Sequence, residues 1–130
     1  MLRIWPKFTL DHIGGVLDQG YFKKITNLLE GVKSVSFLGS IEKEKLQTIL
    51  ASYDLLLHSS FIEGGSLVIQ EAQNAGLPII ASDISCHTSL LGSDYVGLHS
   101  VGSAIDVSEK LHTFFFDELF RKQMEKQLSS

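Results

Sequence analysis

The chain has 130 residues, of which 44% are hydrophobic and 20% are charged, and its formal net charge is -4. This length suffices for one domain with a buried core but is too short for two. The negative charge and the scattered lysines exclude a nucleic-acid-binding surface, which needs a clustered basic face. No apolar stretch approaches the ~20 residues of a transmembrane segment. The single cysteine, Cys86, fits a reducing compartment, so we expect a cytoplasmic globular domain, with peripheral membrane association of a longer protein as the alternative.

The first half of the chain alternates between strand-like and helix-like patterns. Apolar residues recur at helical spacing over residues 19–30, and Gly31 follows where a helix C-cap is expected. A second helix is predicted over residues 41–53, and the segment 6–18 is predicted to be a loop. Strands are predicted for residues 2–5, 35–38 and 54–58. The last of these is a continuous apolar run, which is typical of a strand covered on both faces.

The second half continues the alternation. A helix is predicted over residues 66–75, with Ser66 as its N-cap and Gly76 at its C-terminal end. Residues 83–94 are predicted to be a loop. The remaining predicted elements are strands at residues 77–81 and 95–99 and helices at residues 103–116 and 118–127.

Regular alternation of strands and helices with short connections predicts an α/β fold. The expected architecture is a Rossmann-like parallel sheet with helices on both faces and right-handed crossovers. Ligands of such sheets bind at the carboxyl ends of the strands. The loops that follow Trp5, Leu38, His58 and Ala81 are therefore the places to look for a site.

The segment from Glu63 to Glu71 combines glycines, a helix start and two carboxylates. Gly64 and Gly65 leave backbone amides accessible, and the first-turn amides of the helix that follows have no acceptor within the helix. This arrangement favours an anionic or polyhydroxylated ligand. The two carboxylates, roughly 8–10 Å apart along the chain, could each accept a hydrogen bond from a different hydroxyl group. On spacing alone, a surface Glu63 and a solvated helical Glu71, stabilised near the positive end of the helix, are the better explanation.

A family resemblance adds to this reading. The sequence from Glu63 to Ser82, EGGSLVIQEAQNAGLPIIAS, resembles the E-x7-E signature of the GT4-type retaining glycosyltransferases, with its trailing E-A-x-x-x-G-x-P. The upstream segments VSFLG at residues 35–39 and YDLLLHSS at residues 53–60 are similar to two further motifs of that family, in the same order. The resemblance implies that the chain is the donor-binding C-terminal half of a two-domain GT-B enzyme.

The resemblance also implies roles for matching residues. Glu63 would hold a hydroxyl of the donor sugar and act as the catalytic residue, and Glu71 would hold the ribose. The other implied donor-binding positions are Gly64, Gly65, Ser66, Gly39, Ile41 and His58. The donor would be a nucleotide sugar, UDP-linked, with no cofactor and no metal. The family's Arg and Lys that neutralise the diphosphate, and its N-terminal acceptor domain, have no counterpart in these 130 residues.

One departure of this sequence from the family motif indicates a subgroup of that family. Gly65 stands where the family has a bulky residue, and this Glu-Gly-Gly form, with the segments 89–97 and 100–102, is similar to the selenosugar synthases of selenoneine biosynthesis. That similarity implies selenophosphate as the acceptor.

Two other readings stay open from the residues alone. His58 could instead be a buried histidine that never touches ligand. The chain could also be a noncatalytic nucleotide-binding or interaction module. A receiver-like signalling domain fits less well, because its central strand should end in a phosphoacceptor Asp and this one ends in His58-Ser59.

Overall fold

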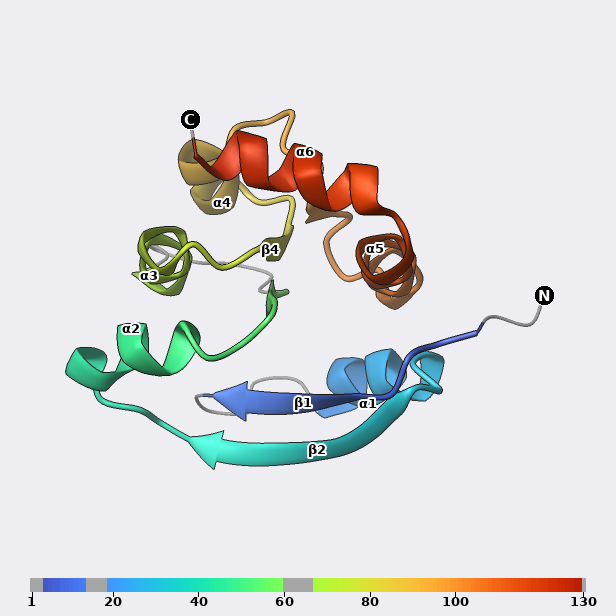
Figure 1. Cartoon of the computed structure of the whole chain (residues 1–130). Helices are drawn as coiled ribbons and strands as arrows, with labels where there is room; N and C mark the ends of the chain where they lie inside the picture. The colour runs from blue at the N-terminus through green and yellow to red at the C-terminus, as the bar shows by residue number, and fades with distance from the viewer. Residues whose placement is uncertain (1–3, 14–18, 60–66, 130) are drawn as a thin grey trace.

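The computed structural model describes residues 4–13, 19–59 and 67–129 (Figure 1). In chain order, the elements are β1 (Phe8–Ile13), α1 (Gln19–Leu28), β2 (Val32–Gly39), α2 (Lys43–Leu50), β3 (Leu56–His58), α3 (Leu67–Ala75), β4 (Ile79–Ser82), α4 (Ser85–Leu91), β5 (Leu98–His99), α5 (Ala104–Phe116) and α6 (Glu118–Leu128). Strands and helices alternate as predicted. In the part of the chain that is described, no helix is long and apolar enough to cross a membrane.

All strand pairings are parallel, which confirms the predicted α/β class. β1 pairs with β2, and β4 pairs with β3 on one side and β5 on the other. The register places His58 beside Ala81 and Ser82 beside His99. The sheet is nevertheless in two parts, because β1 and β3 are not hydrogen-bonded neighbours (Figure 1). A single continuous sheet was expected, and the described strands do not form one.

The core is centred on β4, all four residues of which are buried. Because a parallel strand is covered by helices on both faces, its apolar run needs no alternation. Buried side chains from the surrounding helices complete this core; they are Ile69, Ala72, Val107, Leu111, Phe114 and Met124. β3 differs from the prediction, since its three residues are only half-buried.

The first strand is not where the sequence pattern put it. Ile4 and Trp5 are not in a strand, and β1 lies inside the segment predicted to be a loop. Within β1, Phe8 and Leu10 are half-buried and Thr9 between them is exposed, a short alternation that was overlooked. Pairing with β2, rather than local propensity, selects the strand conformation. Residues 2 and 3 of the predicted strand lie outside the described part of the chain.

The segment 83–94 is also corrected, because α4 occupies most of it. His87 is buried, and Leu90 and Leu91 on the same side of the helix pack against the core. The residue at the N-cap, Ile84, has no side chain able to cap the helix. Since the usual start signal is missing, the helix is stabilised by its packing and could not be recognised from local sequence.

Gly76 agrees with its predicted place at a helix end, and Gly31 does not. Gly76 ends α3 and Gly39 ends β2, each with φ of 71°, a conformation that favours glycine. Gly31, predicted as a helix C-cap, does not have positive φ. It is buried, and a side chain there would collide with the backbone of Pro6 and with Trp5. Close packing, rather than helix termination, explains this glycine.

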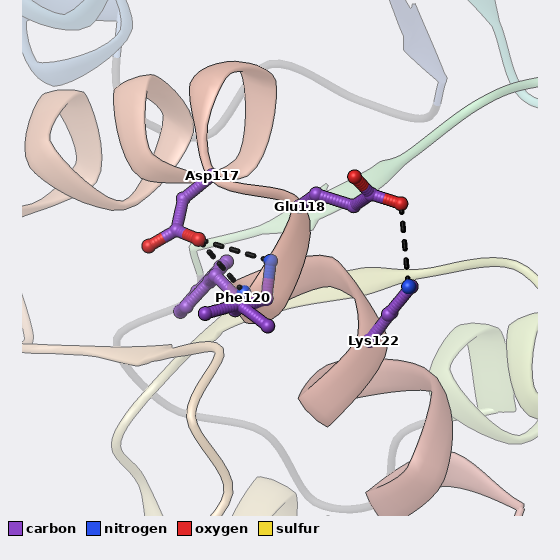
Figure 2. A network of polar contacts seen from close by, with 5 residues as sticks. Asp117, Glu118, Phe120 and Lys122 are labelled. Carbon is purple, nitrogen blue, oxygen red and sulfur yellow. Dashed lines mark hydrogen bonds and ion pairs between the residues drawn. The ribbon is translucent and has the colours of Figure 1, made fainter.

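The two C-terminal helices begin and end within one residue of the predicted bounds. The start of each is marked by a capping side chain that is local in sequence. The Ser103 hydroxyl accepts a hydrogen bond from the Asp106 amide at the start of α5. Figure 2 shows the Asp117 carboxylate accepting bonds from two amides at the start of α6, at 3.0 Å from Leu119 and 3.2 Å from Phe120. Such caps satisfy amides that have no partner within the helix.

Candidate functional site

Polar side chains gather where β3, β4 and β5 end. His58 is the last residue of β3, Ser82 of β4 and His99 of β5, and the three strands are hydrogen-bonded neighbours. The carboxyl edge of a parallel sheet is where ligands of this fold class bind. These polar groups lie at the edge of the sheet where the sequence predicts a site.

His99 ties the end of β5 to the residue that follows β3. Its ring Nδ1 lies 2.8 Å from the carbonyl oxygen of Ser100, so Nδ1 carries the proton and donates it. Its Nε2 lies 2.9 Å from the Ser59 hydroxyl and, in the neutral ring, accepts a hydrogen bond from it. His99 is buried, and burial lowers the pKa of its imidazole below its ordinary value. The ring is therefore a neutral link across the sheet edge.

His87, on α4, also uses Nδ1 to contact a backbone carbonyl. It is fully buried, and its Nδ1 lies 2.8 Å from the carbonyl oxygen of Ser82 and 3.2 Å from the Ser82 hydroxyl. The carbonyl contact again requires a proton on Nδ1. Its ring centroid is 5.0 Å from that of His58. The histidine rings thus extend the polar edge from β3 to α4.

The residues predicted to bind the donor divide into two groups. Glu63, Gly64, Gly65 and Ser66 lie outside the described residues, so their predicted contacts stay predictions. The other four residues are described. Gly39 ends β2, Ile41 lies between β2 and α2, His58 ends β3, and Glu71 lies in the second turn of α3.

These four described residues are related to one another through the packing of the helices and strands that carry them. Glu71 is half-buried on α3, and α3 packs against α2, the helix that follows Ile41. Gly39 is exposed at the end of a strand in the other part of the sheet. His58 is half-buried and contacts His87.

Sequence reasoning missed three members of this edge: Ser82, His87 and His99. The helical spacing of His87 with Leu90 and Leu91 was a usable signal for α4. The bond between Ser59 and His99 joins residues 40 positions apart, so no local pattern could reveal it.

Comparison with known proteins assigns the chain to a family. The model of the family described as glycosyl transferases group 1 matches residues 5–129. The chain belongs to this family. A curated relative, glycosyltransferase 1 domain-containing protein 1 of Xenopus tropicalis, is 30% identical over 93 residues, which is 72% of this chain and 27% of the relative. The chain thus spans about a quarter of that relative's length.

Solved structures agree with this assignment. This group 1 domain superposes on HepE of Anabaena, crystallised with UDP and glucose, with a TM-score of 0.70 and 25% identity; the match covers 92% of this chain and 34% of HepE. Sucrose-phosphate synthase of Thermosynechococcus elongatus gives a TM-score of 0.69 at 20% identity, covering 92% of this chain and 32% of that protein. These neighbours have the GT-B fold, which confirms the predicted fold class.

Proposed function

We propose that the chain forms the nucleotide-sugar-binding half of a retaining glycosyltransferase. The observation that supports this most is the family match over residues 5–129. The similarity to a protein crystallised with UDP and glucose supports a UDP-linked donor. The chain's relatives are several times longer, so transfer itself is proposed for the longer enzyme and not for these 130 residues.

The proposed contacts follow from chemistry and position. Glu71 lies half-buried on the second turn of α3, where a carboxylate can accept hydrogen bonds from the two vicinal hydroxyls of a ribose. Glu63 would accept from a sugar hydroxyl, and the amides of Gly64, Gly65 and Ser66 would face the sugar and the diphosphate. Gly39 and Ile41 would lie near the base. His58, at the end of β3, would lie beside the phosphates.

The proposed reaction needs no covalent catalysis by residues of this half of the enzyme. The acceptor forms its bond to the anomeric carbon on the face from which the diphosphate leaves, the bond between that carbon and the diphosphate breaks, and negative charge builds on the departing diphosphate. Backbone dipoles and positive charge fixed in place around that group would stabilise it, which is electrostatic catalysis. We propose that no metal or cofactor takes part. The Glu-Gly-Gly form of the motif suggests selenophosphate as the acceptor, read mainly by a partner domain N-terminal to this one.

Substitutions at the two glutamates should distinguish an effect on sugar transfer from an effect on nucleotide binding. In the longer enzyme, Glu63→Ala should lower kcat for transfer at least tenfold while UDP binding changes little, because its partner is the sugar. Glu71→Ala should weaken both, because its partner is the ribose. Transfer rates and UDP affinity by calorimetry measure the two effects.

A matched carboxylate control is available on α6. Glu125 is exposed there, and Glu125→Ala should leave both quantities unchanged. Assignment of the two glutamates would be wrong if their variants behaved like Glu125→Ala.

A further inference from the structure

The hydrogen bond between Ser59 and His99 links two strands that are not neighbours. In the described sheet β4 lies between β3 and β5, so β3 and β5 are roughly 10 Å apart. His99, the last residue of β5, is level with Ser82 at the end of β4. Its imidazole reaches past the end of β4, and its Nε2 lies 2.9 Å from the hydroxyl oxygen of Ser59, the first residue after β3. A side chain therefore joins β5 to the residue after β3 at the carboxyl edge of the sheet.

The imidazole of His99 is itself held in place through α5. Its Nδ1 donates to the Ser100 carbonyl at 2.8 Å, and the Ser100 amide donates to the Asp106 carboxylate at 2.6 Å. Asp106 lies in the first turn of α5, and its own amide donates to the Ser103 hydroxyl that caps this helix. A series of hydrogen bonds thus connects the start of α5 to Ser59. Because only 1% of His99 is exposed, its ring cannot turn away from these partners to water.

Ser59 gains from such a support because the strand ladder ends just before it. The parallel register of β3 with β4 runs from Leu56 to His58, and Ser59 is the next residue. A residue beyond the end of a ladder keeps more backbone freedom, and a ligand that binds there has to remove that freedom. A hydrogen bond that fixes Ser59 beforehand lowers this cost and thereby raises the affinity for the ligand.

We propose that His99 is a positioning residue for the donor nucleotide. It holds Ser59 at the carboxyl edge of the sheet, next to His58, so that the diphosphate of the donor meets an end of β3 that is already ordered. His99 is too deeply buried to contact the ligand, whereas Ser59 is half-buried and can do so. This proposal rests on the proposed function, because it requires that the edge of the sheet binds a nucleotide sugar.

Two substitutions break the bond from opposite ends. Ser59→Ala removes the donor, and His99→Leu replaces the ring with an apolar side chain of similar size. Each should weaken UDP binding, measured from the amide shifts of the 15N-labelled chain, by about three- to tenfold, the size of one neutral hydrogen bond. Because both remove the same bond, the double variant should bind UDP about as weakly as His99→Leu alone. In His99→Gln the amide oxygen can accept from Ser59, so its affinity should stay within about twofold of the unsubstituted chain.

Asp117→Ala is the matched control for a loss of stability. It removes the cap of α6, which is not part of the series of bonds from α5 to Ser59, so UDP affinity should not change although the protein is less stable. If circular dichroism shows that His99→Leu does not fold, Ser59→Ala provides the test, because it removes only the hydroxyl of a half-buried side chain. The ring 15N resonance of His99 Nε2 should then shift in Ser59→Ala more than that of Nδ1, which shows that the bond is lost.

The outcomes separate this proposal from the proposed function. UDP binding that Ser59→Ala and His99→Leu leave unchanged would overturn the positioning role and leave the nucleotide site in place. Equal weakening by His99→Leu and Asp117→Ala would also overturn it, since the effect would then be one of stability. Additive losses in the double variant would do the same, because the two residues would act independently. Absence of UDP binding by the unsubstituted chain would contradict the proposed function, and this proposal with it.

Discussion

His99 and His87 use the same ring nitrogen to donate to a backbone carbonyl, which sets the tautomer of each ring. In His99 the other nitrogen accepts from Ser59, the first residue after β3. Of this edge, only His58 was predicted from sequence, because it ends a recognisable apolar run. His99 joins the edge through its contact with Ser59, 40 positions away, which no local pattern encodes. His87 bonds to Ser82 only five positions away, and its spacing with Leu90 and Leu91 was a usable local signal.

A fall in stability on mild acidification should follow from the lowered pKa of His99. The unfolded chain takes up a proton near the ordinary value of 6.5, whereas burial makes the folded chain resist it. The stabilising contribution is therefore complete above pH 6.5 and is lost as pH falls from there towards the lower folded pKa. The free energy of unfolding should drop by up to about 1.4 kcal/mol per pH unit for this one group. Urea unfolding at pH 7.5, 6.5 and 5.5 measures it.

His99→Gln is the control for that measurement, because the amide keeps an acceptor for Ser59 but does not titrate. Its pH dependence between 7.5 and 5.5 should be shallower than that of the unsubstituted chain. An unchanged slope would assign the effect to the other histidines and contradict this account of His99.

Helices with side-chain signals at their ends were predictable, and elements held by packing or pairing were not. α3 ends at Gly76, and α5 and α6 begin at Ser103 and Asp117, all of which the sequence displays. β1 exists through its pairing with β2, and α4 through the burial of His87. Local propensity is a weak guide to such elements, because tertiary contacts decide their conformation.

Asp117 should matter more to stability than the ion pair beside it. Asp117→Ala removes the acceptor for two amides of α6 and should lower the free energy of unfolding by about 1 kcal/mol. Glu118 pairs with Lys122 at 3.4 Å, but both side chains are about 70% exposed, so Glu118→Gln should cost less than about 0.5 kcal/mol (Figure 2). Chemical denaturation of both variants measures the difference, and equal losses would show that the cap is not the stabilising feature.

At the scale of the whole molecule, the sequence predicted an α/β fold and the edge of the sheet where a ligand is expected, because alternating elements and parallel strands impose both. It did not predict that the sheet would divide between β1 and β3. Whether the strands form one continuous sheet depends on which strands are neighbours in space. The order of the strands along the chain does not determine this. The division lies at the centre of the sheet, so the candidate site receives polar groups mainly from β3, β4 and β5.

Titration of the 15N-labelled chain with UDP tests the central claim most directly. If the chain is a donor-binding domain, amide shifts at Gly39, Ser59 and Glu71 should change and saturate. Glu71→Ala should weaken the affinity at least tenfold, because a hydrogen bond to a charged acceptor contributes about 1.5–3 kcal/mol. No change in amide shifts at millimolar UDP, or equal affinity in the Glu71→Ala variant, would contradict the account.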